Sequence, residues 1–171
     1  DGDVENLVLT GGTAIDGTGN GSDNGLTGNA GDNLLSGAAG NDTLDGGAGA
    51  DTLDGGTGAD ALAGGAEGDI YIVDDPGDTV TEYPGGGVDQ VRSSISFTLP
   101  DDVDQLMLTG SGTIDGSGNG LANEIDGNDA ANSLAGGAGD DVLVGNGGDD
   151  TLDGGTGGDE MNGGAGNDTY R

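Results

Sequence analysis

Residues 37–63 read GAAGNDTLD, GGAGADTLD and GGTGADALA, three consecutive units of nine residues. Each unit opens with a glycine-rich run and places an aspartate at its sixth position and a leucine at its eighth. A fixed nine-residue period fits neither a helix of 3.6 residues per turn nor a simple hairpin array. It is typical of a solenoid, whose units bury apolar residues only against one another. The stretch therefore predicts an all-β solenoid of stacked coils.

Within one unit we expect six residues of turn and three of strand. Glycines allow the positive φ angles and close backbone approach of a tight turn. The side chains of Thr43 and Asp45 should lie on the opposite face of the strand from that of Leu44, because side chains alternate along a strand. One turn and one strand reverse the chain, so two nine-residue units should complete one coil. Unit n then lies over unit n+2, which places Asp42 above Asp60 and Asp51 above Asp69.

The stacked aspartates predict a bound cation. Parallel strands lie about 4.8 Å apart, and two carboxylates at that spacing repel each other by about 3 kcal/mol at an effective dielectric constant near 20. Calcium suits a flexible cage of carboxylate and carbonyl oxygens better than magnesium does. We therefore predict several calcium ions and a largely unfolded metal-free chain. The predicted ligands are the sixth-position acids Asp42, Asp51, Asp60, Asp69, Asp141, Asp150, Asp159 and Asp168.

These units resemble the calcium-binding nonapeptide of RTX proteins, GGxGxDxUx, in which U is a large apolar residue. Residues 46–54 (GGAGADTLD) match it at every defined position. The resemblance implies a right-handed parallel β-roll or β-helix solenoid, with calcium held between stacked turns by sixth-position side chains and turn carbonyls. The carbonyls that it implies belong to Gly37, Ala39, Gly46, Ala48, Gly55, Thr57, Gly64, Gly136, Ala138, Gly145, Gly147, Gly154, Thr156 and Gly163.

Some units depart from the pattern. The sixth position is an asparagine, with a neutral oxygen, at Asn24, Asn33, Asn123 and Asn132. Calcium sites built on these residues should be weaker or remain empty. In GGAEGDIYI (64–72), Tyr71 replaces the leucine, and we expect it to be a core residue that closes the row. The ninth-position acids Asp45, Asp54 and Asp153 should point outward.

The chain repeats itself on a larger scale. Residues 103–120 (VDQLMLTGSGTIDGSGNG) echo residues 4–21 (VENLVLTGGTAIDGTGNG) at an offset of 99 residues. We predict a first block at 1–72, with a flanking strand in 3–18 and nonapeptides in 19–72, then a β spacer at 73–102 and a second block at 103–171. The last block stops in mid-period, which favours a piece of a longer array. The expected inward residues outside the nonapeptides are Ile15 and, in one long strand over 88–100, Val91, Ile95, Phe97 and Leu99.

Composition excludes several classes of function. The chain has 43 glycines, 33 acids, two basic residues and neither histidine nor cysteine, for a formal charge of −31. Thiol and imidazole catalysis and disulfides are therefore excluded. The negative field opposes nucleic-acid binding, and no apolar run approaches the roughly 20 residues of a membrane helix. Composition alone would favour acidic disorder, but leucines held at every ninth residue oppose it.

Two functions remain open. The first is a calcium-stiffened structural segment of a bacterial secreted or cell-surface protein, such as an adhesin, surface-layer component or filament, with possible self-association. The second, by resemblance, is an accessory module of an enzyme exported by type I secretion, such as a protease, lipase or alginate epimerase. Under both, the segment itself is not an enzyme, and it folds where calcium is abundant outside the cell. Glycoside hydrolysis and ice binding are disfavoured, because the repeat already explains the carboxylate pairs and the outward row Thr43, Thr52, Ala61 is short.

Overall fold

The computed structural model describes residues 4–171, which form strands and loops and contain no helix that could cross a membrane. Residues 1–3, where the predicted first block and flanking strand begin, lie outside the described residues. The chain divides into two compact units, unit 1 at residues 1–89 and unit 2 at residues 90–171. This division falls inside the predicted spacer at 73–102.

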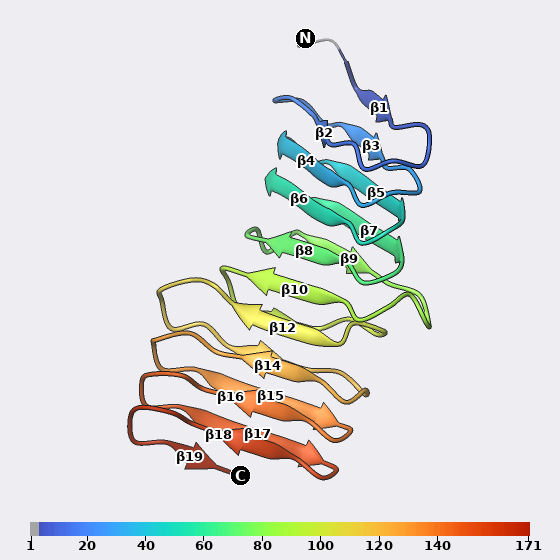
Figure 1. The fold of residues 1–171 in the computed structure, drawn as a ribbon. Helices are drawn as coiled ribbons and strands as arrows, with labels where there is room; N and C mark the ends of the chain where they lie inside the picture. The colour runs from blue at the N-terminus through green and yellow to red at the C-terminus, as the bar shows by residue number, and fades with distance from the viewer. Residues whose placement is uncertain (1–3) are drawn as a thin grey trace. The chain divides into compact units, whose positions relative to one another are not determined.

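Unit 1 consists of two parallel sheets whose strands alternate along the chain (Figure 1). One sheet has the order β1-β3-β5-β7-β9, and the other holds β2, β4, β6 and β8 as neighbours in that order. Because each strand crosses to the opposite sheet, the chain completes one coil every two strands. The strands are β1 (Asn6–Val8), β2 (Gly17–Thr18), β3 (Gly25–Thr27), β4 (Leu34–Ala39), β5 (Thr43–Ala48), β6 (Thr52–Thr57), β7 (Ala61–Ala66), β8 (Ile70–Val73) and β9 (Thr79–Thr81).

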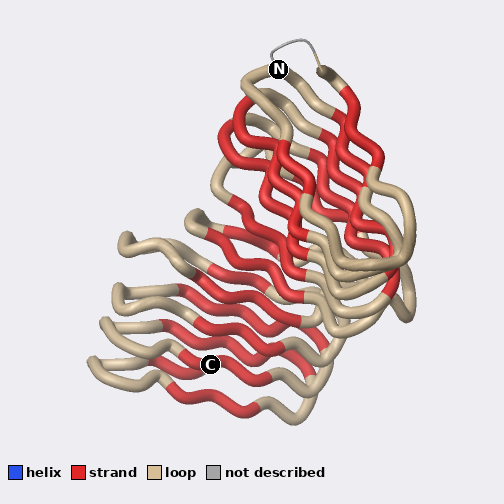
Figure 2. Tube along the Cα trace, turned by 45° about the horizontal axis from the view of Figure 1, so that its top comes forward, coloured by secondary structure: helices blue, strands red, loops and turns tan. Residues whose placement is uncertain are grey.

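Unit 2 follows the same plan, with β10, β12, β14, β16 and β18 in one sheet and β11, β13, β15, β17 and β19 in the other. Within each unit the strands run side by side, with loops at their ends (Figure 2). The strands are β10 (Gln90–Ser93), β11 (Phe97–Thr98), β12 (Gln105–Leu108), β13 (Gly116–Ser117), β14 (Glu124–Asp126), β15 (Ser133–Ala138), β16 (Val142–Val144), β17 (Thr151–Thr156), β18 (Glu160–Asn162) and β19 (Thr169–Tyr170).

The strand register confirms that unit n of the repeat lies over unit n+2. Eighth-position residues pair directly, as Leu44 does with Leu62 and Leu53 does with Tyr71. These side chains form the core between the two sheets of each unit. The buried members are Leu26, Leu35, Leu44, Leu53, Leu62 and Tyr71 in unit 1, and Ile125, Leu134, Leu143 and Leu152 in unit 2. Leu106 of β12, which lies outside the nonapeptides, is also buried and pairs with Ile125. Most coils therefore contribute one large apolar residue from each of their two strands, whereas β2 and β13 place Gly17 and Gly116 at the inward position.

The strands of the strong units are longer than the sequence indicates. We expect three strand residues per unit, but β5 runs for six, from Thr43 to Ala48. Pairing resumes after a skipped residue, because Asp45 lies opposite Ala63 and Gly47 lies opposite Gly65 while Gly46 stays outside the register. The glycine pair thus bends the strand without ending it, and only residues 49–51 remain as the turn before β6.

Two expectations about core residues are wrong in part. Ile15 is 41% exposed, and Gly17 takes the inward position, opposite Leu35. A Cβ on Gly17 would lie 3.1 Å from a methyl group of Leu35 and 3.1 Å from one of Leu7, so these leucines already fill the space.

The expected strand over 88–100 is two strands, β10 and β11. The hydroxyl of Ser93 accepts the N–H of Ile95 at 3.2 Å and donates to its carbonyl at 2.8 Å, and this local turn interrupts the ladder. Val91 and Leu99 are buried as expected, whereas Ile95 and Phe97 are only half-buried.

Candidate metal centres

The sixth-position side chains are stacked in columns by backbone hydrogen bonds. The N–H of Asp42 donates to Oδ1 of Asp60 at 2.6 Å, and the N–H of Asp51 donates to Oδ1 of Asp69 at 2.7 Å. Each bond joins residues 18 apart, one coil to the next. The columns run Asn24, Asp42, Asp60, Asp78 and Asn33, Asp51, Asp69, Asp89 in unit 1, then Asn123, Asp141, Asp159 and Asn132, Asp150, Asp168 in unit 2.

The second oxygen of these carboxylates, Oδ2, is the atom that the columns leave available to a ligand. The Oδ2 atom is buried and has no hydrogen-bond partner in Asp42, Asp51, Asp60, Asp69, Asp141 and Asp150. Asp159 and Asp168, in the last coil, are half-buried. Buried polar atoms almost always have a partner, so a row of buried carboxylate oxygens without one is an arrangement that a cation would complete.

Backbone carbonyl oxygens of the next coil lie near the Oδ2 atoms, on either side of a first-position glycine. The point where a Cβ of Gly37 would lie is in contact with Asp42 Oδ2 and is 2.7 Å from the carbonyl oxygen of Gly55. The equivalent point at Gly46 is in contact with Asp51 Oδ2 and is 2.7 Å from the Gly64 carbonyl oxygen. The missing side chain thus leaves space where oxygens of two coils converge, and oxygens of both kinds are the ligands that calcium prefers.

The same arrangement, a first-position glycine between an Asp Oδ2 and a carbonyl oxygen of the next coil, recurs in unit 2, and we call it a glycine cradle. Gly136 faces Asp141 Oδ2 and the Gly154 carbonyl, and Gly145 faces Asp150 Oδ2 and the Gly163 carbonyl. In both cradles the carbonyl oxygen is 2.6 Å from the point where a Cβ on the glycine would lie. Glycine is therefore required at the first position for the space that a Cβ would fill, while its backbone carbonyl supplies the oxygen as any residue's would.

The third-position residues are held differently. The carbonyl of Thr57 accepts the N–H of Gly40 at 3.0 Å, and that of Thr156 accepts the N–H of Gly139 at 2.9 Å. Ala39, Ala48, Ala138 and Gly147 donate their N–H groups to the carbonyls of Asn20, Asn29, Asn119 and Asn128. These contacts belong to the ladder between coils, and a ligand role for the third-position carbonyls stays a prediction.

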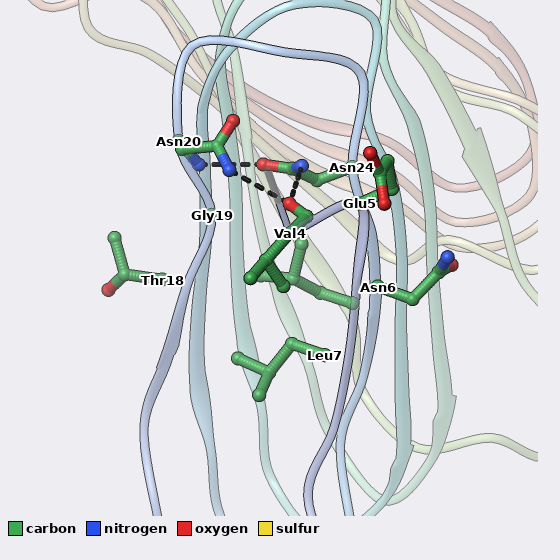
Figure 3. A pocket seen from close by; sticks show the side chains of 9 residues that line it. Val4, Glu5, Asn6, Leu7, Thr18, Gly19, Asn20 and Asn24 are labelled. Atoms are coloured by element: carbon green, nitrogen blue, oxygen red, sulfur yellow. Dashed lines mark hydrogen bonds between the residues drawn. The ribbon is translucent and has the colours of Figure 1, made fainter. Parts of the chain in front are cut away.

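The asparagines satisfy their side chains through protein groups (Figure 3). Oδ1 of Asn24 accepts the N–H of Asn20 at 2.6 Å, and its Nδ2 donates to the carbonyl of Val4 at 3.0 Å. Asn33 repeats this with Asn29 and Ile15, both at 2.8 Å. Asn123 and Asn132 do the same in unit 2. The amide N–H group therefore engages a carbonyl oxygen of the neighbouring coil, an interaction that no carboxylate can make.

Burial shapes the electrostatics of the aspartate columns. Desolvation raises the pKa of Asp51 to about 6, although the backbone N–H of Asn33 partly offsets it. Desolvation, reinforced by nearby acids, raises the pKa of Asp69 to about 7. Burial also raises the pKa of Asp60 and of Asp150. Burial thus disfavours the ionised form of these four carboxylates, and a bound cation would favour it.

Three acids of unit 1 join the columns although no complete nonapeptide marks them. Asp78 and Asp89 accept the N–H groups of Asp60 and Asp69. Both precede an inward valine by two residues, in Asp-Thr-Val (78–80) and Asp-Gln-Val (89–91), so the Asp-x-apolar core of the motif was a usable signal. Glu82 carries no such signal, yet its carboxylate lies within 4.8 Å of those of Asp69 and Asp89.

Tyr71 is a fully buried core residue, as expected. Its hydroxyl also accepts the N–H of Gly64 at 2.8 Å and donates to Glu82. Of the ninth-position acids, Asp45 is exposed, while Asp54 and Asp153 are half-buried.

Comparison with known families agrees with this geometry. The family model described as the RTX calcium-binding nonapeptide repeat (4 copies) matches residues 18–53, 36–71, 117–152, 126–161 and 136–170. No curated protein matches the chain significantly. The matched segments cover more than half of the chain and contain the glycine cradles, the six aspartates named above for their unpartnered Oδ2 atoms, and every column residue except Asp78 and Asp89. The chain therefore belongs to the RTX calcium-binding nonapeptide repeat family and is a calcium-binding parallel β-solenoid.

Proposed function

We propose that this calcium-binding module is a structural segment of a bacterial secreted or cell-surface protein, and that it folds when it meets extracellular calcium. The observation that supports the proposal is the row of buried Oδ2 atoms without partners. A fold that stacks such atoms coil upon coil is stable only when something neutralises them.

The leucines and the acids of the repeat have opposite effects on folding. The leucine columns supply apolar burial, but they come into register only when the acids of successive coils are brought together. Where calcium is scarce, as in the cytosol, repulsion along the columns keeps the chain open, which suits export through a type I channel. Extracellular calcium modules bind with dissociation constants of roughly 10⁻⁴–10⁻³ M, so binding free energy becomes folding free energy outside the cell.

The test of the folding switch is a calcium titration followed by circular dichroism. We expect the β signal to be lost in chelator and to return with calcium, while magnesium at the same concentration restores much less of it. An unchanged β signal and an unchanged melting temperature in a metal-depleted buffer would contradict the proposal.

A structural role further implies that the segment catalyses no reaction and associates with itself. Light scattering and electron microscopy with and without calcium test the association, and we expect larger particles in calcium. Particles that stay strictly monomeric in calcium would contradict self-association. They would leave the accessory module of an exported enzyme as the better account, to be tested by whether the full-length gene product contains a catalytic domain.

A further inference from the structure

Glu82 stands where the repeat would place the next first-position glycine of its column. Gly28, Gly46 and Gly64 follow one another at one-coil intervals, and the next position in this series is residue 82. At Gly46 the cradle holds Asp51 Oδ2 and the Gly64 carbonyl oxygen. At Gly64 the cradle holds Asp69 Oδ2 and the hydroxyl of Tyr71. This hydroxyl donates a hydrogen bond to Glu82. A carboxylate and a phenol thus replace the carbonyl of the regular site.

The groups around this point are buried and oriented. Asp69, Glu82 and Asp89 are 1%, 7% and 1% exposed, and each offers a carboxylate oxygen within 4.8 Å of the other two. Glu82 is fixed at both oxygens, since Oε1 accepts the Tyr71 hydroxyl and Oε2 accepts the N–H of Tyr83 at 3.1 Å. Asp89 Oδ1 accepts the N–H of Asp69 at 2.8 Å.

Two observations point to a cation here rather than to a chance gathering of acids. Asp69 Oδ2 is buried, has no hydrogen-bond partner and lies in the cradle beside Tyr71. Unit 1 also contains no lysine or arginine, because the two basic residues of the chain are Arg92 and Arg171. No side chain of unit 1 can therefore neutralise the three carboxylates.

We infer that Asp69, Glu82 and Asp89 form a calcium site of a second kind, which we call the tricarboxylate site. The regular cradles pair one unpartnered carboxylate oxygen with a carbonyl from the next coil, whereas the tricarboxylate site offers three carboxylates. Because affinity for calcium rises with the charge of the ligand set, the tricarboxylate site binds more tightly than the nonapeptide sites and fills first. The inference does not depend on the structural role proposed above.

Terbium, which replaces calcium at oxygen sites, tests the inference through its luminescence sensitised by a nearby tyrosine. The chain has three tyrosines and no tryptophan, so Tyr83→Phe with Tyr170→Phe leaves Tyr71 as the sole donor. In this background we expect sensitised emission within the first equivalent of terbium, reversed by excess calcium. The added Glu82→Gln change should weaken that first binding event at least tenfold, and the matched control Asp45→Asn, at an outward acid, should change it less than twofold.

The outcomes separate the tricarboxylate site from the nonapeptide sites. Asp42→Asn, in the other column, should lower the total number of ions bound without changing the first event. Equal terbium affinity with and without Glu82→Gln would overturn the inference, even if the calcium-induced β signal remained. So would the absence of any tight first event, which would mean that protons neutralise the acids.

Glu82→Asp covers the case in which Glu82→Gln does not fold. It keeps the charge but withdraws the carboxylate by one methylene, and we expect a severalfold weaker first event. An unchanged affinity would again overturn the inference.

Discussion

Asn33 and Asp51 occupy equivalent positions one coil apart, and their side chains meet different partners. Asn33 donates to a carbonyl of the preceding coil through Nδ2, whereas Asp51 leaves Oδ2 buried without a partner. The backbone differs as well. Four residues before Asn33, the N–H of Asn29 binds the side chain. Four residues before Asp51, Gly47 has a positive φ of 100°. One functional group thus decides whether a coil is satisfied by the protein or by calcium.

Replacing Asp51 by Asn should have opposite effects with and without calcium. In calcium, Asp51→Asn removes a buried ligand and should destabilise the fold by about 3–5 kcal/mol. In chelator it removes a desolvated charge and should stabilise residual β structure by on the order of 1 kcal/mol. The control Asp54→Asn, next to the buried Leu53, should change stability by less than about 0.5 kcal/mol in either buffer. Thermal melts of both variants check this, and equal shifts in calcium would contradict the assignment of Asp51.

Replacing Ala38 by glycine should stabilise the calcium-bound fold. Its φ of 87° lies in the left-handed region, which costs an L-residue about 1–2 kcal/mol. Ala38→Gly relieves that strain but adds freedom to the unfolded chain, so we expect a net gain of up to about 1 kcal/mol in calcium. Ala61→Gly is the control, because Ala61 lies exposed within β7, and it should lose about 0.5–1 kcal/mol. A loss at both positions in denaturant melts would refute the strain at Ala38.

At the scale of the strand, the alternation of inward and outward residues carries the stability. β4 places Leu35 fully inside and Leu34 outside, 47% exposed. Leu35→Ala should destabilise the calcium-bound fold by about 2–5 kcal/mol through lost burial and a cavity. Leu34→Ala should stay within about 0.5 kcal/mol. Urea melts of the two variants provide the comparison, and similar midpoints would mean that the strand is not in the observed register.

The nine-residue period was sufficient to predict the stacking of Leu44 on Leu62 and of Asp42 on Asp60, because every unit carries the same residue at the same phase. It was insufficient wherever a contact comes from outside the repeat. Gly17 is inward because Leu7 fills the space beside it, and the strand after Val88 ends at Ser93 because of a side-chain turn. Glu82 reaches the column from an irregular segment, and no periodicity encodes that approach.

For the whole molecule, with its formal charge of −31, protonation of the acids at low pH is a second source of stability beside calcium. The pKa values of Asp51 and Asp69 in the fold are about 6 and about 7, above the ordinary 3.8. Since folding raises them, their contribution to the metal-free fold is full below about pH 4 and is lost as pH rises through 6 to 7. The β signal in metal-depleted buffer should therefore increase from pH 8 to pH 5.

Calcium should reverse the sign of this dependence. Bound carboxylates favour the ionised form, so acidification of the calcium-saturated protein displaces the ion and lowers its melting temperature. Melts over the same pH range with and without calcium should give slopes of opposite sign. Parallel slopes would show that the buried carboxylates are not the groups that bind calcium.

The near-identity of the coils also has a consequence for how the chain finds its fold. β6 and β17 have the same six residues, TLDGGT, although 99 positions separate them. Each can in principle pair with the other's neighbours, so mispaired intermediates compete with correct assembly. Glu82 and the Ser93 turn break the degeneracy, because neither has a counterpart among the other described coils, whereas the bond of Tyr71 to Gly64 recurs between Tyr170 and Gly163. Glu82 and the Ser93 turn act as register marks that hold a repetitive chain to a single order of coils.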